Sequence, residues 1–577
     1  MEGAYAKKLN VWGVVAKTSK SREVDANYPI YILVAVQAKF SYLQKKKKKK
    51  KKRKMEATLA LVLISLAMAA SITCAAKVLN FLWLKPRKLE KFLRNQGLHG
   101  TPYRPFIGDV KDMMKAIKAE QPKSIELSDE DTSPHIFAYY YDILKKYGKN
   151  SFFWFGPWPK LNIVDPDLIK EILKKYDVFE KPHTETAKIL TSGIVLLEGE
   201  KWAKHRKIIN PAFHLHKLKN MVPAIGLSCT NMISKLKSKV CSSTGGSCEI
   251  DMWACLEDFT GDVISRTAFG SNHDQGTKII QLQREKLKLT LQLLQFSFIP
   301  GWSYLPTKLN NKIKAINNEI ESLLRGIIDK RQKAMDRGDE APSDDLLGIL
   351  MESNSRFVEE CENKNKGMSI EDVIEECKLF YVAGSETTAC LLVWTMVLLC
   401  EHIEWQTRAR EEVIQVFGNS EPSFEGLNQL KKVNMILQEV LRLYPPLPMI
   451  NRYSTKTVKL ENLTIPAGVH LLLMVGLVHR NSDIWGDNAN EFNPLRFSDG
   501  VSKIQSSFVP FSSGPRICVA QNFAMVEAKM ALATILRSFS FELSPSYLHA
   551  PFSVTTLQPQ YGAPIIFQSL EPFISGS

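Results

Sequence analysis

Hydrophobic side chains recur at helical spacing over most of this 577-residue chain, whereas runs typical of strands are few and short. Amphipathic patterns extend from about residue 134 to about residue 445, and another helical pattern covers residues 521–539. The strand-like runs include residues 160–164 and 469–475. The pattern predicts a mainly α fold with a smaller β part.

The longest predicted helix begins at Ser369 and continues to about residue 405, with few helix-breaking residues on the way. Ser369-Ile-Glu-Asp372 resembles a capping box in which Asp replaces the usual Glu or Gln. The middle of this helix holds a polar patch, residues 383–388, inside an apolar stretch. An acid, Glu386, next to a hydroxyl, Thr387, suits a proton relay. A polar kink without chemistry is the alternative, and the patch alone leaves both interpretations open.

Residues 57–76 form a run of twenty residues without a charge. At about 1.5 Å per residue, this run is long enough to span the hydrocarbon core of a bilayer. A cleaved signal peptide is the alternative, but its apolar part is usually only about 7–15 residues. The length of the run and the aromatic residues that follow it favour an uncleaved anchor, residues 55–84. A basic and Pro/Gly-rich connector, residues 85–110, then leads to one large domain, residues 111–577.

The net charge of +16 is concentrated in the first 54 residues, which hold sixteen Lys or Arg against three acidic residues. The rest of the chain is nearly balanced, so its charge does not indicate a nucleic-acid-binding protein. The basic run at 45–54 and the basic residues after the anchor favour opposite membrane orientations. This conflict would vanish if translation began at Met55. We therefore interpret residues 1–54 as a basic leader that is an artefact of the gene model.

The ten cysteines are too sparse for a disulfide scaffold and show no paired Cys-x-x-Cys spacing. Cys518 differs from the others because it ends a loop with Gly and Pro and is followed at once by a helical pattern. A helix N-terminus stabilises a thiolate, which can act as a nucleophile or as a metal ligand. A single thiolate without other Cys or His ligands suits an iron that is already held in a haem.

Glu439 and Arg442 lie three residues apart and therefore share one face of a predicted helix. The default interpretation is an exposed ion pair, which contributes little to stability. The pair becomes informative only if other residues hold it inside the protein.

Together, these motifs resemble those of the cytochrome P-450 monooxygenases. Phe511-x-x-Gly-x-Arg-x-Cys518-x-Ala is similar to the haem-binding loop of the family, and residues 383–388 are similar to its oxygen-activating helix. The family's ion pair matches Glu439-x-x-Arg442, and two further elements match at residues 202–206 and 493–497. The resemblance covers about residues 55–577. The sequences of residues 84–109 and 521–551 are similar to the secologanin-synthase-like group of plant microsomal enzymes.

The resemblance implies a role for each matched residue. Cys518 would be the axial thiolate of a haem b, with Phe511 beside it in the same loop. Glu386 and Thr387 would help to deliver protons to dioxygen. A buried charge network would brace the loop, and a second set of residues would bind the haem propionates. The network would consist of Glu439, Arg442 and Arg496, and the propionate-binding residues would be Trp202, Arg206, Arg452 and Arg516.

The implied function is that of a haem-thiolate monooxygenase. It would use dioxygen and electrons from an NADPH-dependent flavoprotein reductase to oxidise a lipophilic small molecule, a terpenoid or a plant hormone. The resemblance also implies a single-pass protein of the endoplasmic reticulum membrane, with its catalytic domain in the cytosol, contact with membrane lipid and no nucleic-acid partner. A haem-thiolate isomerase or dehydratase is one alternative, although such enzymes generally lack the acid–threonine pair. A weakly active or non-catalytic haem-binding membrane protein is the other.

Four residues depart from the pattern of related plant enzymes. Ser512 and Ser513 stand where Gly and Trp are usual, Ala520 replaces a Gly, and Leu495 replaces an acid. None of these changes removes a ligand, but together they predict looser packing around the haem.

Overall fold

The computed structural model describes residues 28–570, except 122, 128–130, 184, 191, 244, 270–272, 294–300, 338–344, 361–366, 502–506 and 554. The first half of the predicted leader, residues 1–27, therefore lies outside the described residues. The chain forms two compact units, Met1–Phe81 and Leu82–Ser577.

In the first unit, α2 (Tyr28–Leu79) is one continuous helix that contains both the basic run and the apolar run. The π-helical turn η1 (Asn80–Leu84) follows it. Apolar side chains of the 57–76 segment are exposed, among them Leu61 and Ile72. The region Val36–Arg94 includes a stretch long and apolar enough to cross a membrane. Exposed apolar side chains on such a helix are suited to lipid, which agrees with the predicted anchor.

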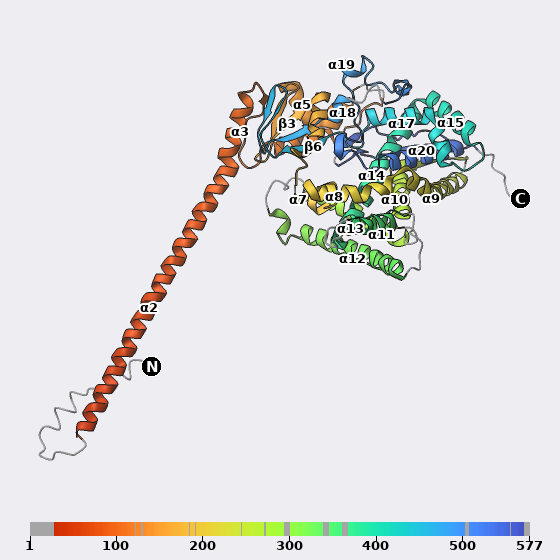
Figure 1. The fold of residues 1–577 in the computed structure, drawn as a ribbon. Helices are drawn as coiled ribbons and strands as arrows, with labels where there is room; N and C mark the ends of the chain where they lie inside the picture. The colour runs from red at the N-terminus through yellow and green to blue at the C-terminus, as the bar shows by residue number, and fades with distance from the viewer. Residues whose placement is uncertain are drawn as a thin grey trace. The chain divides into compact units, whose positions relative to one another are not determined.

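The second unit is mainly helical with small sheets (Figure 1), which confirms the predicted fold class. Its helices and helical turns are α3 (Lys85–Arg94), α4 (Val110–Glu120), α5 (Ser133–Tyr147), α6 (Pro166–Lys174), α7 (Glu185–Leu190), α8 (Gly199–Ile209), η2 (Asn210–Phe213), α9 (Leu215–Cys241), α10 (Met252–Phe269), α11 (His273–Leu291), η5 (Trp302–Tyr304), α12 (Lys308–Arg337), α13 (Leu346–Glu360), α14 (Ile370–Glu401), α15 (Ile403–Phe417), α16 (Phe424–Gln429), α17 (Lys431–Leu443), α18 (Val475–Val478), α19 (Ser482–Trp485), η7 (Pro494–Phe497), η9 (Gly514–Arg516) and α20 (Gln521–Ser538). Its strands are β1 (His99–Gly100), β2 (Ser151–Phe155), β3 (Trp158–Ile163), β4 (Phe179–Glu180), β5 (Ser247–Asp251), β6 (Ile450–Ser454), β7 (Val458–Leu460), β8 (Leu463–Ile465), β9 (His470–Leu473), β10 (Phe539–Leu543), β11 (Pro551–Ser553), β12 (Leu557–Pro559) and β13 (Pro564–Ser569).

The largest sheet has the strand order β1-β2-β3-β9-β6-β4. The two strands predicted near residues 160 and 470 are confirmed as β3 and β9, which pair in parallel with Lys160 beside His470. Strand β6 runs antiparallel to β9 and places Tyr453 beside His470. The register therefore aligns Lys160, His470 and Tyr453 in one row across three strands.

The breaker-rich segment after α3 belongs to the folded second unit. The connector predicted over residues 85–110 contains the strand β1, which pairs in parallel with β2. Tyr103 is 3% exposed. A Cβ on Gly100 would lie 2.1 Å from the carbonyl oxygen of Phe152, so this glycine is required by close contact between the two strands.

Helix α14 confirms the long helix predicted from Ser369. The Ser369 hydroxyl accepts a hydrogen bond from the Asp372 backbone N–H at 3.1 Å, and the Asp372 carboxylate accepts one from the Ser369 N–H at 3.3 Å. In the apolar window of α14, 78% of the residues are buried, packed by neighbours that include α10, α12, α17 and α20. This second apolar helix is therefore a core element rather than a membrane span.

Candidate functional site

A cavity of about 920 Å³ lies inside the second unit. Helix α14 contributes part of its 383–388 patch to the wall, the loop before α20 contributes Cys518, and strands β3, β6 and β9 contribute further residues. The wall is largely apolar and includes Ile194, Leu196, Phe213, Leu379, Phe380 and Met449. Motifs that are far apart in the sequence thus meet at one cavity.

Cys518 lies between η9 and α20, at the end of a tightly bent loop. Its backbone N–H donates to the Phe511 carbonyl oxygen at 2.9 Å. Gly514 has a φ of +69°, and a Cβ there would lie 2.9 Å from the carbonyl oxygen of Leu173. The bend therefore requires glycine. Both Phe511 and Cys518 line the cavity.

The Cys518 thiol lies deep in the protein, although its side chain is exposed to the cavity. Burial raises the pKa of this thiol, whereas the Ala520 backbone N–H and the charges of Arg206 and Lys181 lower it. A metal ion bound here would deprotonate the thiol. Within the described residues, no three His, Cys, Asp or Glu side chains gather as a metal site. The position therefore suits a metal that brings its other ligands with it, as haem iron does.

The basic side chains of the cavity wall include a group of four whose charges act on one another: Lys181, Arg206, Arg452 and Arg516. Burial lowers the pKa of Lys181 well below its usual value, and the charges of Arg452, Arg516 and Arg206 lower it further. Burial also lowers the pKa of Arg452 and that of Arg516 to about 10. Buried positive charges that act on one another require an anionic partner.

Two of these cations have fixed partners: Arg206 bonds to the Cys518 loop, and Arg516, which belongs to that loop, bonds to residues outside it. Arg206 Nη1 donates to the Ile517 carbonyl oxygen at 2.8 Å. Arg516 forms an ion pair with Glu198, and its guanidinium lies 4.4 Å from the ring centroid of Trp202. Trp202, Arg206 and Arg516, which were expected to bind propionates, therefore meet at one wall.

The remaining cations of this group have little compensation from acids. Arg452 is 4% exposed, and its Nη1 donates to a backbone carbonyl at 2.9 Å. Glu180, the acid next to Lys181, accepts a hydrogen bond from the Tyr453 hydroxyl at 2.8 Å. The surplus of positive charge fits the two propionates of a haem. Sequence analysis missed Lys181, which lies directly after the two-residue strand β4 and belongs to no recognisable motif.

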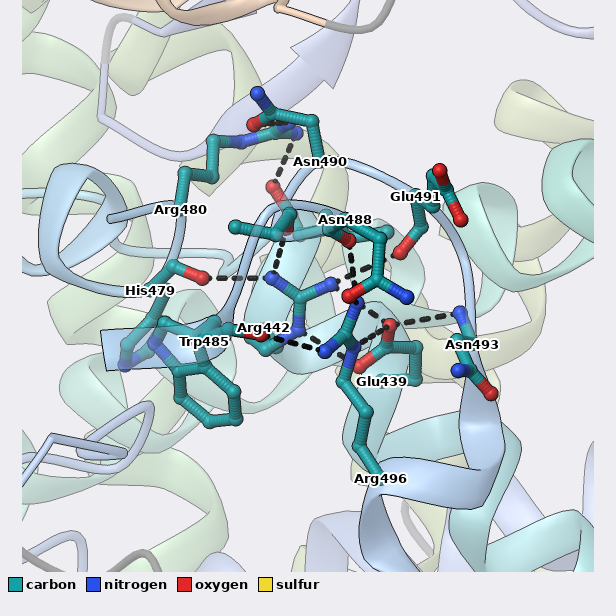
Figure 2. Close-up of polar contacts among 12 residues, drawn as sticks. Glu439, Arg442, His479, Arg480, Trp485, Asn488, Asn490, Glu491, Asn493 and Arg496 are labelled. Carbon is teal, nitrogen blue, oxygen red and sulfur yellow. Dashed lines mark hydrogen bonds and ion pairs between the residues drawn. The ribbon is translucent and has the colours of Figure 1, made fainter. Parts of the chain in front are cut away.

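Figure 2 shows the buried charge network around Glu439 and Arg442, which are both 0% exposed. Arg442 Nε and Nη2 donate to the two Glu439 carboxylate oxygens at 2.7 Å each. Three backbone carbonyls also accept from Arg442, and Arg496 Nε lies 3.5 Å from Glu439 Oε1. The pair is therefore not an exposed ion pair. It belongs to a network that reaches the segment before the Cys518 loop.

His479 connects this network to the start of that loop. Its carbonyl oxygen accepts from Arg442 Nη1 at 2.7 Å, and its ring Nε2 accepts from the Val509 backbone N–H at 3.1 Å. Burial and the charge of Arg442 lower the pKa of His479 to about 3, so the ring is neutral at pH 7. Sequence analysis missed this residue because neither partner is close to it in the chain.

The two residues of the predicted proton relay have different surroundings. Thr387 lines the cavity, and its hydroxyl donates to the Ala383 carbonyl oxygen at 2.6 Å. Glu386 accepts hydrogen bonds from Thr555 at 3.1 Å, from Thr556 at 2.5 Å and from Gln558. Thr387 is thus the member that reaches the cavity wall, while Glu386 lies in a polar cluster formed with the β11–β12 hairpin.

The four departures from the family pattern differ in their surroundings. Ser512 has a φ of +65°, a conformation that costs a residue with a Cβ roughly 1–2 kcal/mol. The hydroxyls of Ser512 and Ser513 are buried and have no hydrogen-bond partner within the described residues. Ala520 lines the cavity, whereas Leu495 is 54% exposed. The expectation of looser packing therefore concerns the two serines and Ala520.

Comparison with known proteins agrees with these features. The sequence model of the family described as Cytochrome P450 matches residues 126–561. Cytochrome P450 CYP72A219 of Panax ginseng is 54% identical over 498 residues, which are 86% of this chain and 96% of that protein. Cytochrome P450 72A15 of Arabidopsis thaliana is 53% identical over the same shares. Cytochrome P450 716A67 of Medicago truncatula is 49% identical over 499 residues, 86% of this chain and 95% of that protein.

Proposed function

Because the chain belongs to the cytochrome P450 family, we propose that it oxidises a lipophilic small molecule and that Cys518 would supply the thiolate ligand of its haem iron. The enzyme is a monooxygenase of the plant CYP72 type that uses haem b and NADPH-derived electrons supplied by a reductase.

The observation that carries the proposal is that three groups of side chains with different chemistry meet at one cavity. Cys518 faces the cavity from a bent loop, a group of basic side chains lies beside it, and Thr387 reaches the wall from α14. The thiol suits the iron, the cations suit the propionates, and the hydroxyl suits a proton transfer.

When bound, the haem supplies the activation of dioxygen at an iron made electron-rich by the thiolate. The protein residues hold this group and control protons and water. Arg206 would bind a propionate while its bond to the Ile517 carbonyl keeps the loop in place. Thr387 Oγ1 would hold a proton at the cavity wall, and Glu386 would exchange protons with it from the neighbouring polar cluster. The apolar wall would exclude water from the substrate.

We further propose a terpenoid or a plant hormone as the substrate and a flavoprotein as the reductase. The mainly apolar wall of the cavity supports a lipophilic molecule. Glu439, Arg442 and Arg496 would brace the haem-binding loop from the side opposite the substrate.

For the location, we propose the endoplasmic reticulum membrane, with residues 55–84 as the single anchor and the catalytic domain in the cytosol. The exposed apolar side chains of α2 support the anchor. The basic residues that follow it, from Lys77 to Arg94, support a cytosolic catalytic side. Mass spectrometry of the native protein tests the start at Met55, since peptides from residues 1–54 should then be absent.

A carbon monoxide difference spectrum of the reduced holoprotein tests the haem assignment. The wild-type protein should show a thiolate-type band, and this band should disappear in Cys518→Ala. Cys248→Ala is the control, because Cys248 is a partly exposed cysteine on β5. A thiolate-type band in Cys518→Ala would overturn the assignment of the ligand.

A further inference from the structure

A buried histidine joins helix α8 to helix α14 beside the cavity. His205, which precedes the cavity-lining Arg206 in α8, is 1% exposed. Its ring Nδ1 lies 2.6 Å from Oε1 of Glu376 in α14, whose side chain is 0% exposed. Its ring Nε2 lies 3.7 Å from Oδ2 of a second acid of α14, Asp372. Both ring nitrogens of His205 are thus close to carboxylates of one helix.

Glu376 depends on His205 more than Asp372 does. Lys201 Nζ lies 2.6 Å from Asp372 Oδ1, so Asp372 has a cation of its own. Among the residues that the structure describes, the ion-pair partner of Glu376 is His205 alone. Because a carboxylate only accepts hydrogen bonds, Nδ1 of His205 carries the hydrogen between them. Loss of the imidazole would leave a fully buried carboxyl group without its ion-pair partner, which is costly.

The second oxygen of Glu376 holds part of the cavity wall, residues 192–198, which we call the wall segment. Glu376 Oε2 accepts a hydrogen bond from the Ile194 N–H at 3.0 Å. The preceding acid, Glu375, accepts one from the Ser192 N–H at 2.8 Å. Ile194 and the two residues after it line the cavity. Two consecutive acids of α14 therefore fix the first half of the wall segment by its backbone.

The wall segment lies so close to α14 that its second residue must be glycine. A Cβ on Gly193 would lie 2.8 Å from Glu376 Oε2 and 3.0 Å from the Glu375 carbonyl oxygen. Any larger residue would push the segment away from the two acids. This close approach is evidence, independent of the hydrogen bonds, that the segment is built to fit against α14.

The other end of the wall segment is held by the Cys518 loop. The Leu197 carbonyl oxygen accepts a hydrogen bond from Arg516 Nη1 at 2.7 Å, and Glu198 forms an ion pair with the same guanidinium. Helix α8 begins directly after Glu198, and its Arg206 returns to the loop through the Ile517 carbonyl oxygen. The contact between His205 and α14 therefore closes a ring of contacts that runs through the wall segment, α8 and the Cys518 loop.

We propose that His205 is a positioning residue of the haem site. Through Glu376 it would fix helix α8, and with it Arg206, against α14. It would also keep Glu376 in place as the acceptor for the wall segment. This inference deepens the proposed function and rests on it, because Arg206 has a propionate to bind only if the protein holds a haem.

Two properties of the holoprotein should depend on this position. A fixed α8 and a fixed wall segment retain the haem, so their release should let it leave faster. The positive charge of Arg206 favours the reduced iron, which carries one positive charge fewer than the oxidised iron. Displacement of Arg206 should therefore also lower the reduction potential.

The test compares three variants of the full-length holoprotein with the wild type. His205→Leu removes the donor to Glu376, whereas His205→Asn keeps an N–H donor at the position of Nδ1. Lys207→Met is the matched control, since Lys207 lies on the same helix and pairs at 3.0 Å with Glu360, both being more than 60% exposed. Hydrogen-exchange mass spectrometry follows residues 192–198, transfer of haem to apomyoglobin gives its rate of loss, and redox titration gives the potential.

His205→Leu should raise the exchange rate of the wall segment and the rate of haem loss by on the order of 10-fold or more, the effect expected when a buried charged group loses a hydrogen bond. Its reduction potential should fall. His205→Asn should restore all three properties towards the wild-type values, and Lys207→Met should not change them.

The inference is overturned if His205→Leu matches the wild type in any of the three measurements, or if His205→Asn is as impaired as His205→Leu. If His205→Leu does not fold, Glu376→Gln decides, because its single amide oxygen cannot accept from both His205 and Ile194 as the two carboxylate oxygens do. Unchanged exchange of the wall segment in Glu376→Gln would then overturn it. Failure of the proposed function is distinguishable, because it removes the thiolate-type carbon monoxide band of the wild-type protein, whereas amide exchange is measured without reference to the haem.

Discussion

Removal of the Arg442 side chain tests whether the buried charge network supports the Cys518 loop. In Arg442→Ala, Glu439 keeps a carboxylate that is 0% exposed but loses both of its 2.7 Å hydrogen bonds from Arg442. The carbonyls of His479, Ala489 and Glu491 also lose a donor. We expect the fold to be destabilised and the haem to be lost with it.

The size of the effect follows from these contacts. Removing one partner of a buried ion pair costs about 3–5 kcal/mol, and a buried carbonyl without its donor adds about 1–3 kcal/mol. Arg496, with its Nε 3.5 Å from Glu439 Oε1, compensates for part of the remaining charge. We therefore expect Arg442→Ala to lower the free energy of unfolding by about 4–6 kcal/mol. In the double variant Glu439→Ala/Arg442→Ala, the free energy of unfolding should fall by about 2–3 kcal/mol less than the sum of the decreases in the two single variants.

Urea unfolding followed by circular dichroism gives the four free energies of this cycle, and haem content is measured on the same samples. The control cycle uses Lys149 and Asp483, which are 3.2 Å apart and both 73% exposed, and should give a coupling energy below about 1 kcal/mol. A coupling energy for Glu439 and Arg442 no larger than that of the control would refute the reasoning. Full haem content in Arg442→Ala would refute it as well.

Two further predictions concern protons. Thr387→Ala should keep haem but divert reducing equivalents to hydrogen peroxide, measured against NADPH consumption. Thr395→Ala is its control, because Thr395 makes the same kind of hydrogen bond to a backbone carbonyl in the core of α14, at 2.7 Å. An unchanged ratio of hydrogen peroxide to NADPH consumed in Thr387→Ala would contradict the relay. Burial lowers the pKa of His479 and that of His549 to about 3, below the value of about 6.5 in an unfolded chain. Their contribution to stability is present above pH 6.5 and is lost as the pH falls, by about 2 kcal/mol each between pH 7 and pH 5. A urea unfolding midpoint that stays constant between pH 7 and pH 5 would contradict this prediction.

Motifs that depend on neighbours in the chain could be predicted from the sequence. The capping box at Ser369, the strand β3 and the glycine bend before Cys518 all arise from local spacing and local backbone conformation. The resemblance to a family then related these separate motifs to one haem site.

Residues that act through partners distant in sequence could not be predicted in this way. His479 joins Arg442 to Val509, and Lys160 approaches Asn451 across 291 positions of the chain. Nor could periodicity reveal that Glu386 bonds to the β11–β12 hairpin while the adjacent Thr387 lines the cavity. Such pairings depend on strand register and helix packing, which a single sequence does not specify locally.

The apolar character of α14 has a consequence for synthesis on the ribosome. As it emerges, this helix presents the membrane-insertion machinery with a second segment hydrophobic enough to enter a bilayer. Helix α10, which packs against it in the native fold, precedes it by about a hundred residues and is already synthesised at that moment. Helices α11 and α12, which also pack against α14, precede it as well, whereas α17 and α20 appear only later. We therefore expect early docking of α14 onto α10 to keep α14 out of the bilayer.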